Sequence, residues 1–118
     1  LLTTAILYIN EFPDYVADKA AAKCNLVVRL GTARAVFGYC LLMAATYFII
    51  ATAALTGLFP RWSLLALVTL PAAVSATTRL FRYHDDYRHL IPANATTIAV
   101  HFSAGLLLTF AWIAARVI

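Results

Sequence analysis

The stretch AVFGYCLLMAATYFIIATAALTGL occupies residues 35–58 and contains no formal charge. About 17 to 25 mainly apolar residues in a helix are enough to cross the hydrocarbon layer of a membrane. Residues 62–79 and 96–117 are also mainly apolar, with formal charge confined to Arg79 and Arg116. We therefore predict a transmembrane helix over each of these three ranges.

The composition agrees with a membrane protein. Of the 118 residues, 64% are hydrophobic and 12% are charged, and the mean hydropathy is +0.85. A typical soluble domain is about half apolar and about a quarter charged. A soluble helical bundle, the alternative, would need polar helix faces that these runs lack. The predicted fold class is an all-α, polytopic transmembrane helical bundle.

Residues 1–9, LLTTAILYI, are apolar but too short to span a membrane. They lack an initiator Met and the cationic flank of a signal peptide. We interpret them as the last turns of a helix, so the chain would hold three full spans plus the end of a fourth. Residues 1–118 are then expected to be the C-terminal part of a single transmembrane domain.

Cationic residues gather in two segments, 10–34 and 79–96, which are separated by two predicted spans. Seven of the nine Lys and Arg residues belong to these segments: Lys19, Lys23, Arg29, Arg34, Arg79, Arg82 and Arg88. Because Lys and Arg are enriched in cytoplasmic loops, we expect both segments to face the cytoplasm in a multi-pass protein of the cell (inner) membrane. The net charge of +4 then reflects topology, and we expect no nucleic-acid partner.

The segment NEFPDYVADK, residues 10–19, brings carboxylates and a cation next to an apolar run. Asp14 and Asp18 are four residues apart, so on a helix they share one face. Pro13 suits the first turn of that helix, which we expect to run to about Lys23. Two such carboxylates can bind Mg²⁺ together with phosphate oxygens of a ligand. The plainer interpretation is an acidic first turn that complements the helix dipole.

The polar side chains around these carboxylates also allow two interpretations. Lys19, Lys23 and Arg29 either bind phosphate oxygens and stabilise a leaving group, or only mark the cytoplasmic side. Tyr15 shares a helix face with Lys19. Asn10 either orients a ligand or caps the helix.

Features outside this segment predict structure more than chemistry. Pro71 predicts a kink in the second span, and Ala53 with Gly57 forms a pair of small residues that permits close helix contact. Residues 80–95 are expected to form an interfacial loop, either solvated or folded over the site. His101 lies in a predicted span, where an ionisable side chain is a functional candidate. A neutral His bonded to a neighbouring helix is the alternative, and haem ligation would need a second buried His.

Part of the sequence resembles a known motif. NEFPDxxxDK at residues 10–19, followed by Lys23 and by LVVRLG at residues 26–31, resembles the second aspartate-rich motif of UbiA-type membrane prenyltransferases. Within that superfamily the chain is most similar to the 1,4-dihydroxy-2-naphthoate polyprenyltransferases of menaquinone biosynthesis. IPANATTIAVH at residues 91–101 is similar to the same family. The resemblance covers nearly the whole chain, and the aspartate-rich motif is its specific part.

The resemblance implies a fold of nine transmembrane helices around a cavity, of which this chain would hold the end of the sixth to the ninth. It implies transfer of a polyprenyl group from polyprenyl diphosphate to an aromatic acceptor, with Mg²⁺ as cofactor and membrane lipids around the helices. Asp14 and Asp18 would bind the metal and, with Lys19, act in catalysis. The substrate-binding residues would be Asn10, Tyr15, Lys23 and Arg29. The family's first aspartate-rich motif is missing from this sequence, so the chain alone is expected to be inactive.

Two departures from the family pattern fall beside the motif. The family usually has Gly where Ala22 stands and Thr where Asn25 stands. Ala22 adds a methyl group where the chain is expected to turn tightly.

Two alternatives stay open at this point. The acceptor can be 4-hydroxybenzoate, haem or a lipid, or the chain can be a non-catalytic membrane anchor that binds haem through His101.

Overall fold

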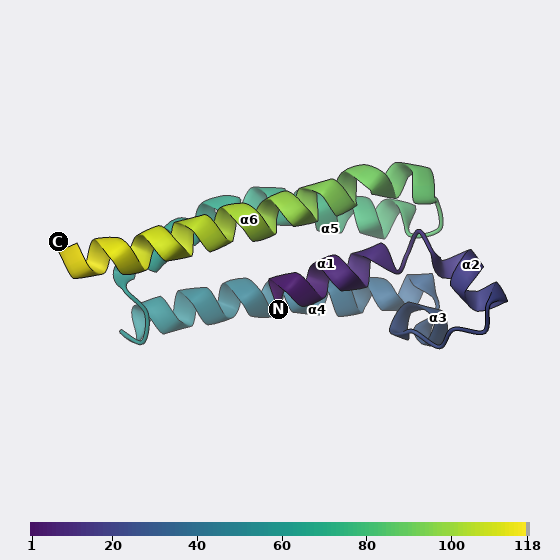
Figure 1. Cartoon of the computed structure of the whole chain (residues 1–118), viewed down its shortest axis with the longest axis horizontal. Coiled ribbons are helices and arrows are strands. Elements are labelled where there is room, and N and C mark those ends of the chain that lie inside the picture. Colours follow the sequence, from purple (N-terminus) through teal and green to yellow (C-terminus); the bar gives the residue numbers. More distant parts are fainter. Residues whose placement is uncertain (118) are drawn as a thin grey trace.

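The computed structural model describes residues 1–117. They form an elongated bundle of helices, 55 Å long, and contain no strand (Figure 1). The prediction of an all-α fold is confirmed. The elements in chain order are α1 (Leu2–Asn10), α2 (Tyr15–Ala20), α3 (Leu26–Leu30), α4 (Thr32–Leu55), the 3₁₀ helix η1 (Arg61–Thr69), α5 (Leu70–Tyr83) and α6 (Tyr87–Val117).

Three helical segments are long and apolar enough to cross a membrane: Thr32–Leu55, Arg61–Tyr83 and Tyr87–Val117. The first begins and ends earlier than the predicted range 35–58. Gly31 before it has a φ of 77° and Gly57 after it has a φ of 81°, values that interrupt a helix and that Gly adopts readily. Gly57 is thus an exposed turn residue, and the predicted helix contact through Ala53 and Gly57 is wrong.

The second span changes helix type along its length. Residues 61–69 form η1, and α5 begins at Leu70 with Pro71 in its first turn. Proline fits there because the first turn of an α-helix leaves its N–H groups without partners within the helix. Pro71 therefore marks the junction between the two helix types.

The predicted loop over residues 80–95 is wrong. α5 continues to Tyr83 and α6 begins at Tyr87, so only residues 84–86 connect them. The Asp86 Oδ1 atom accepts a hydrogen bond from the Arg88 amide at 3.1 Å, which satisfies a free donor at the start of α6. α6 then continues through Pro92. The polar composition of this stretch reflects a helical hairpin at the end of the bundle.

The helices pack around α1 at one half of the bundle. α1 lies between α4 and α6, and the segment formed by η1 and α5 contacts the same two helices from another side. Hydroxyl pairs join helices in the interior: Tyr39 Oη lies 2.6 Å from Thr97 Oγ1, and Tyr47 Oη lies 2.7 Å from Thr69 Oγ1. These bonds satisfy polar groups that would be costly to bury alone.

Small residues allow this close packing. Buried alanines line every long helix: Ala35, Ala53, Ala54, Ala66, Ala73, Ala76, Ala93, Ala104, Ala111 and Ala114. Such residues let helix backbones approach closely in membranes. At Gly38 the approach is tightest, since a Cβ atom there would lie 2.6 Å from Tyr8 Oη of α1. Any larger residue at position 38 would therefore force the Tyr8 side chain of α1 to shift.

Candidate functional site

One end of the bundle carries the predicted site segment. α2, α3, the start of α4 and the turn between α5 and α6 all lie at this end, which we call the charged end (Figure 1). The start of η1 and the end of α6, which carry Arg61 and Arg116, lie at the opposite end. The fold thus places the cationic segments 10–34 and 79–96 together, as their separation by two spans predicts.

Asp14 and Asp18 stand one helical turn apart. The Asp18 amide donates to the Asp14 carbonyl oxygen at 2.8 Å, the spacing expected of an α-helix. Asp14 precedes α2, makes no side-chain capping hydrogen bond and is exposed, whereas Asp18 is buried. The two carboxylates therefore differ: one is open to solvent, and the other is held in the protein.

The predicted helix through Lys23 ends early. α2 stops at Ala20, and Ala22 has a φ of 54°, the left-handed region that favours glycine. The tight turn expected at this position is therefore present, and Ala22 adopts it with its methyl group. The turn brings Lys23 and Asn25 back toward α2.

Both oxygens of Asp18 have protein partners. Lys23 Nζ donates to Oδ1 at 2.7 Å, and Asn25 Nδ2 donates to Oδ2 at 2.8 Å. The hydrogen bond to Asp18 and the negative charge of that carboxylate raise the pKa of the Lys23 ammonium. Lys23, predicted to contact a phosphate, is thus paired with Asp18.

Two side chains that the sequence did not mark as site residues fix the start of α3. Asn25 Oδ1 accepts from the Val28 amide at 2.8 Å, and Glu11 Oε2 accepts from the Val27 amide at 3.3 Å. Both bonds satisfy amides in the first turn of α3, which have no partners within the helix. An Asn directly before the apolar run at residue 26 is a helix-start signal that could have identified Asn25.

Asn10 contacts the last helix. As the final residue of α1, it accepts a hydrogen bond at Oδ1 from Asn94 Nδ2 of α6, at 2.8 Å. Asn94 Oδ1 is buried and has no hydrogen-bond partner within residues 1–117. Asn10 therefore does not cap α2. It joins the aspartate-rich segment to α6.

Of the remaining predicted site residues, Lys19 and Arg29 are exposed and Tyr15 is half-buried. Lys19 Nζ lies 5.6 Å from the centroid of the Tyr15 ring, so the shared helix face predicted for this pair is confirmed. Arg29 lies in the last turn of α3, and the described part of the chain offers it no carboxylate within salt-bridge distance. Both cationic groups are available to a ligand at the charged end.

The turn between α5 and α6 binds to the start of α4 and not to the aspartate pair. Thr32 Oγ1 donates to the Asp85 carboxylate, and His84 Nδ1 lies 3.2 Å from Thr32 Oγ1 and 3.1 Å from Asp85 Oδ1. The Thr32 hydrogen bond is the main cause of a lowered pKa of the Asp85 carboxyl. This arrangement anchors the α5–α6 hairpin on α4.

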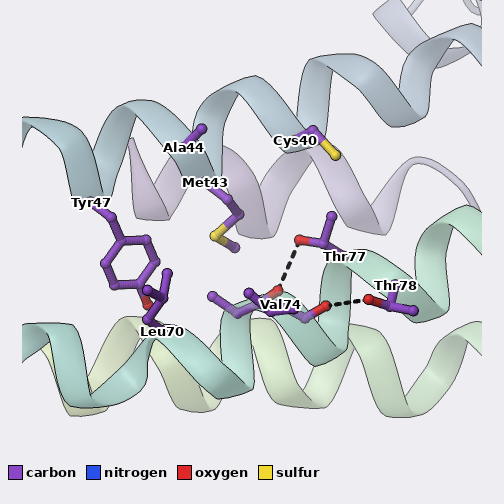
Figure 2. A pocket seen from close by; sticks show the side chains of 9 residues that line it. Cys40, Met43, Ala44, Tyr47, Leu70, Val74, Thr77 and Thr78 are labelled. Carbon is purple, nitrogen blue, oxygen red and sulfur yellow. Dashed lines mark hydrogen bonds between the residues drawn. The ribbon is translucent and has the colours of Figure 1, made fainter.

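An apolar pocket of about 330 Å³ lies between α4 and α5 (Figure 2). Its wall includes Cys40, Met43, Tyr47, Leu70 and Val74. Thr77 and Thr78 also line it, but their hydroxyls donate to the carbonyls of Ala73 and Val74, each at 2.8 Å. The pocket therefore offers mostly hydrocarbon surface, which suits an isoprenoid or acyl chain.

His101 lies on α6 and lines a separate pocket of about 340 Å³, between the start of α1, α4 and α6. His89, near the start of α6, is about 18 Å from His101 along the helix axis. His84 lies in the α5–α6 turn, so neither histidine joins His101. A two-histidine haem site has no support in this arrangement.

Asp14 and Asp18 are oxygen donors of the kind that Mg²⁺ prefers. Within residues 1–117 no group of three or more His, Cys, Asp or Glu side chains could hold a metal ion. Mg²⁺ commonly takes only one or two protein carboxylates and completes its shell with waters and substrate phosphates. Asp14 is exposed and open to a cation, whereas both Asp18 oxygens have protein partners in this structure. A cation shared by the pair, with further oxygens from a phosphate-bearing ligand, therefore stays a prediction.

The chain is similar in sequence to a known enzyme. The chain is similar to the 2-carboxy-1,4-naphthoquinone phytyltransferase of Synechocystis sp., with 30% identity over 106 residues. The match covers 90% of this chain and 34% of the relative, so the chain spans about a third of that protein's length. No protein-family profile and no solved structure matches the chain. This similarity supports the prenyltransferase superfamily that residues 10–31 resemble.

Proposed function

We propose that this chain is part of a UbiA-type membrane prenyltransferase. The reaction is Mg²⁺-dependent transfer of a polyprenyl group from polyprenyl diphosphate to an aromatic acceptor, 1,4-dihydroxy-2-naphthoate, in menaquinone biosynthesis. The similarity to a naphthoquinone phytyltransferase supports both prenyl transfer and a naphthalene-type acceptor. Because the chain spans a third of that relative, the activity is assigned to the whole protein and not to this segment alone.

One observation carries the proposal. Asp14 and Asp18 lie one helical turn apart at the charged end of a bundle of membrane-spanning helices. A polyprenyl diphosphate has the matching form, with an anionic head for the charged end and a long apolar chain for the helices. By the positive-inside rule, the excess of Lys and Arg at this end supports a cytoplasmic location for it.

Four of the predicted site residues act on the diphosphate group in this proposal. Asp14 and Asp18 hold the cation, which when bound stabilises the departing diphosphate. Lys19 and Arg29 supply positive charge to the same leaving group. The carbon–oxygen bond to diphosphate breaks, a carbon–carbon bond to the acceptor ring forms, and the ring loses a proton. The apolar pocket between α4 and α5 is a place where part of an isoprenoid can lie away from water.

The deciding experiment compares three variants of the full-length protein in membranes supplied with labelled polyprenyl diphosphate. Asp14→Ala and Asp18→Ala should each abolish Mg²⁺-dependent transfer. Asp86→Asn is the matched control, because it removes a carboxylate from the same end of the bundle in the α5–α6 turn. Turnover near the wild-type rate in both Asp→Ala variants would remove the proposed cation site.

The acceptor is tested separately. Membranes receive 1,4-dihydroxy-2-naphthoate, 4-hydroxybenzoate, haem or a lipid acceptor with the same labelled donor. We expect label to appear in prenylated naphthoate. Labelling of another acceptor alone would leave the prenyltransferase assignment intact and overturn the assignment to menaquinone biosynthesis.

A further inference from the structure

The Asp18 carboxylate has two partners of different character. Asn25 is half-buried and donates to Oδ2, while Lys23 donates to Oδ1 from a side chain that is 66% exposed. The Asp18 side chain is itself only 13% exposed. One oxygen of this carboxylate therefore faces a fixed partner, and the other faces a partner that can move into solvent.

Asn25 is fixed because both ends of its amide are bonded. Its Nδ2 donates to Asp18, and its Oδ1 accepts from the Val28 amide at 2.8 Å. Rotation of the side chain would lose the carboxylate bond and the cap of α3 together. Asn25 therefore links the orientation of Asp18 to the start of α3.

Lys23 has the opposite properties. Its ammonium is a compact charge on a flexible stem, and Asp18 is its sole carboxylate partner within residues 1–117. The Lys23 amide also donates to the Asp18 carbonyl oxygen at 2.9 Å, which keeps the backbone close while the side chain is free to swing. The ammonium can leave Oδ1 without disturbing the turn.

We propose that Asn25 is a positioning residue for Asp18 and that the Lys23 ammonium competes with a divalent cation for the Asp18 Oδ1 oxygen. This inference rests on the proposed function, because it takes Asp18 as a cation ligand. Residues that orient a metal-binding side chain typically change metal affinity by about 10- to 100-fold when replaced. Lys23 acts in the other direction, since an exposed ion pair must be broken before the cation binds.

The test measures binding of Mn²⁺, a paramagnetic substitute for Mg²⁺, by electron paramagnetic resonance on the full-length protein in detergent. Asn25→Ser keeps an oxygen for the α3 cap but is too short to reach Asp18, and should weaken binding by about 10-fold. Lys23→Met should strengthen binding by up to about fivefold. Arg34→Met is the charge-matched control, because Arg34 is exposed at the same end without contact to Asp18, and its effect should be smaller.

The outcomes separate this inference from the proposed function. If Asp18→Asn leaves Mn²⁺ affinity unchanged, the proposed function itself is wrong. If Asp18→Asn abolishes binding while Asn25→Ser and Lys23→Met stay within twofold of wild type, only the present inference is wrong. Equal effects of Lys23→Met and Arg34→Met would reduce Lys23 to a general electrostatic role and overturn the competition. Thermal denaturation checks that each variant is folded. If Asn25→Ser does not fold, the comparison of Lys23→Met with Arg34→Met still tests the competition for Asp18.

Discussion

Asn94 of α6 donates a hydrogen bond to Asn10 of α1 at 2.8 Å, joining residues 84 positions apart in the sequence. Asn10 is the last residue of α1 and stands directly before the turn that leads to Asp14. The last helix of the chain therefore helps to set where the aspartate-rich segment begins.

Removing this contact should loosen the segment without unfolding the bundle. Asn94→Ala and Asn10→Ala should each lower the free energy of unfolding by about 1 kcal/mol, the usual net value of such a hydrogen bond. Because both variants lose the same bond, the double variant should cost less than the sum of the two. Reversible denaturation in detergent gives the free energy of unfolding of the wild type, the two single variants and the double variant, which together form a double-mutant cycle. Strict additivity would show that the contact contributes nothing.

Ala22 should be the position at the charged end where a single substitution most readily raises the stability of the fold. A non-glycine residue at positive φ is strained, so Ala22→Gly should raise stability by about 1 kcal/mol. Ala21→Gly is the matched control: its φ of −83° is favourable for alanine, and the change should destabilise the protein. Thermal unfolding of both variants tests the pair, and destabilisation by Ala22→Gly would contradict the strained turn.

A side chain at position 38 should destabilise the protein, because it would displace the Tyr8 side chain. Gly38→Ala would place a Cβ atom 2.6 Å from Tyr8 Oη, and overpacking of this kind typically costs about 1–3 kcal/mol. Gly105→Ala is the control on α6, because no atom lies within 4 Å of its built Cβ position. Adding Tyr8→Phe should recover part of the loss by removing the hydroxyl oxygen. Denaturation midpoints that are equal for Gly38→Ala and Gly105→Ala would refute the close approach.

Asp85 should contribute a pH-dependent part of stability. Its folded-state pKa lies below the ordinary value of 3.8, mainly because Thr32 donates to the ionised carboxylate. The stabilisation is therefore present above about pH 4 and is lost as the pH falls through the folded pKa. Asp85→Asn should lower the unfolding temperature at neutral pH, and the difference from wild type should shrink in acid. A difference that grows toward low pH would contradict this assignment.

Much of the fold could be predicted from hydropathy. Uncharged runs such as residues 35–58 mark spans because length and apolarity are properties of sequence alone. The start of α6 was missed for a physical reason. Residues 87–95 mix polar and apolar side chains and contain Pro92, yet Asp86 caps a helix there and the hairpin anchors on Thr32. Such support comes from tertiary contacts, which a local pattern does not contain.

The candidate site could be predicted in part. Spacing of four residues correctly placed Asp14 and Asp18 one turn apart, and the expected glycine pointed to the turn at Ala22. The metal-binding and catalytic roles of these residues stay predictions. The pairing of Lys23 with Asp18, and of Asn94 with Asn10, depends on how turns and helices meet in space. A list of polar residues therefore identifies candidate ligands but not the contacts that orient them.

Thr77 and Thr78 show how a hydroxyl can be carried into a membrane at little cost. Each hydroxyl donates to a carbonyl of its own helix four residues earlier, so neither needs a hydrogen-bond partner outside α5. Valine has nearly the same shape, so exchanging either residue for it would leave the wall of the pocket between α4 and α5 almost unchanged. Hydropathy scales that count threonine as polar therefore underestimate how apolar the surface of α5 is.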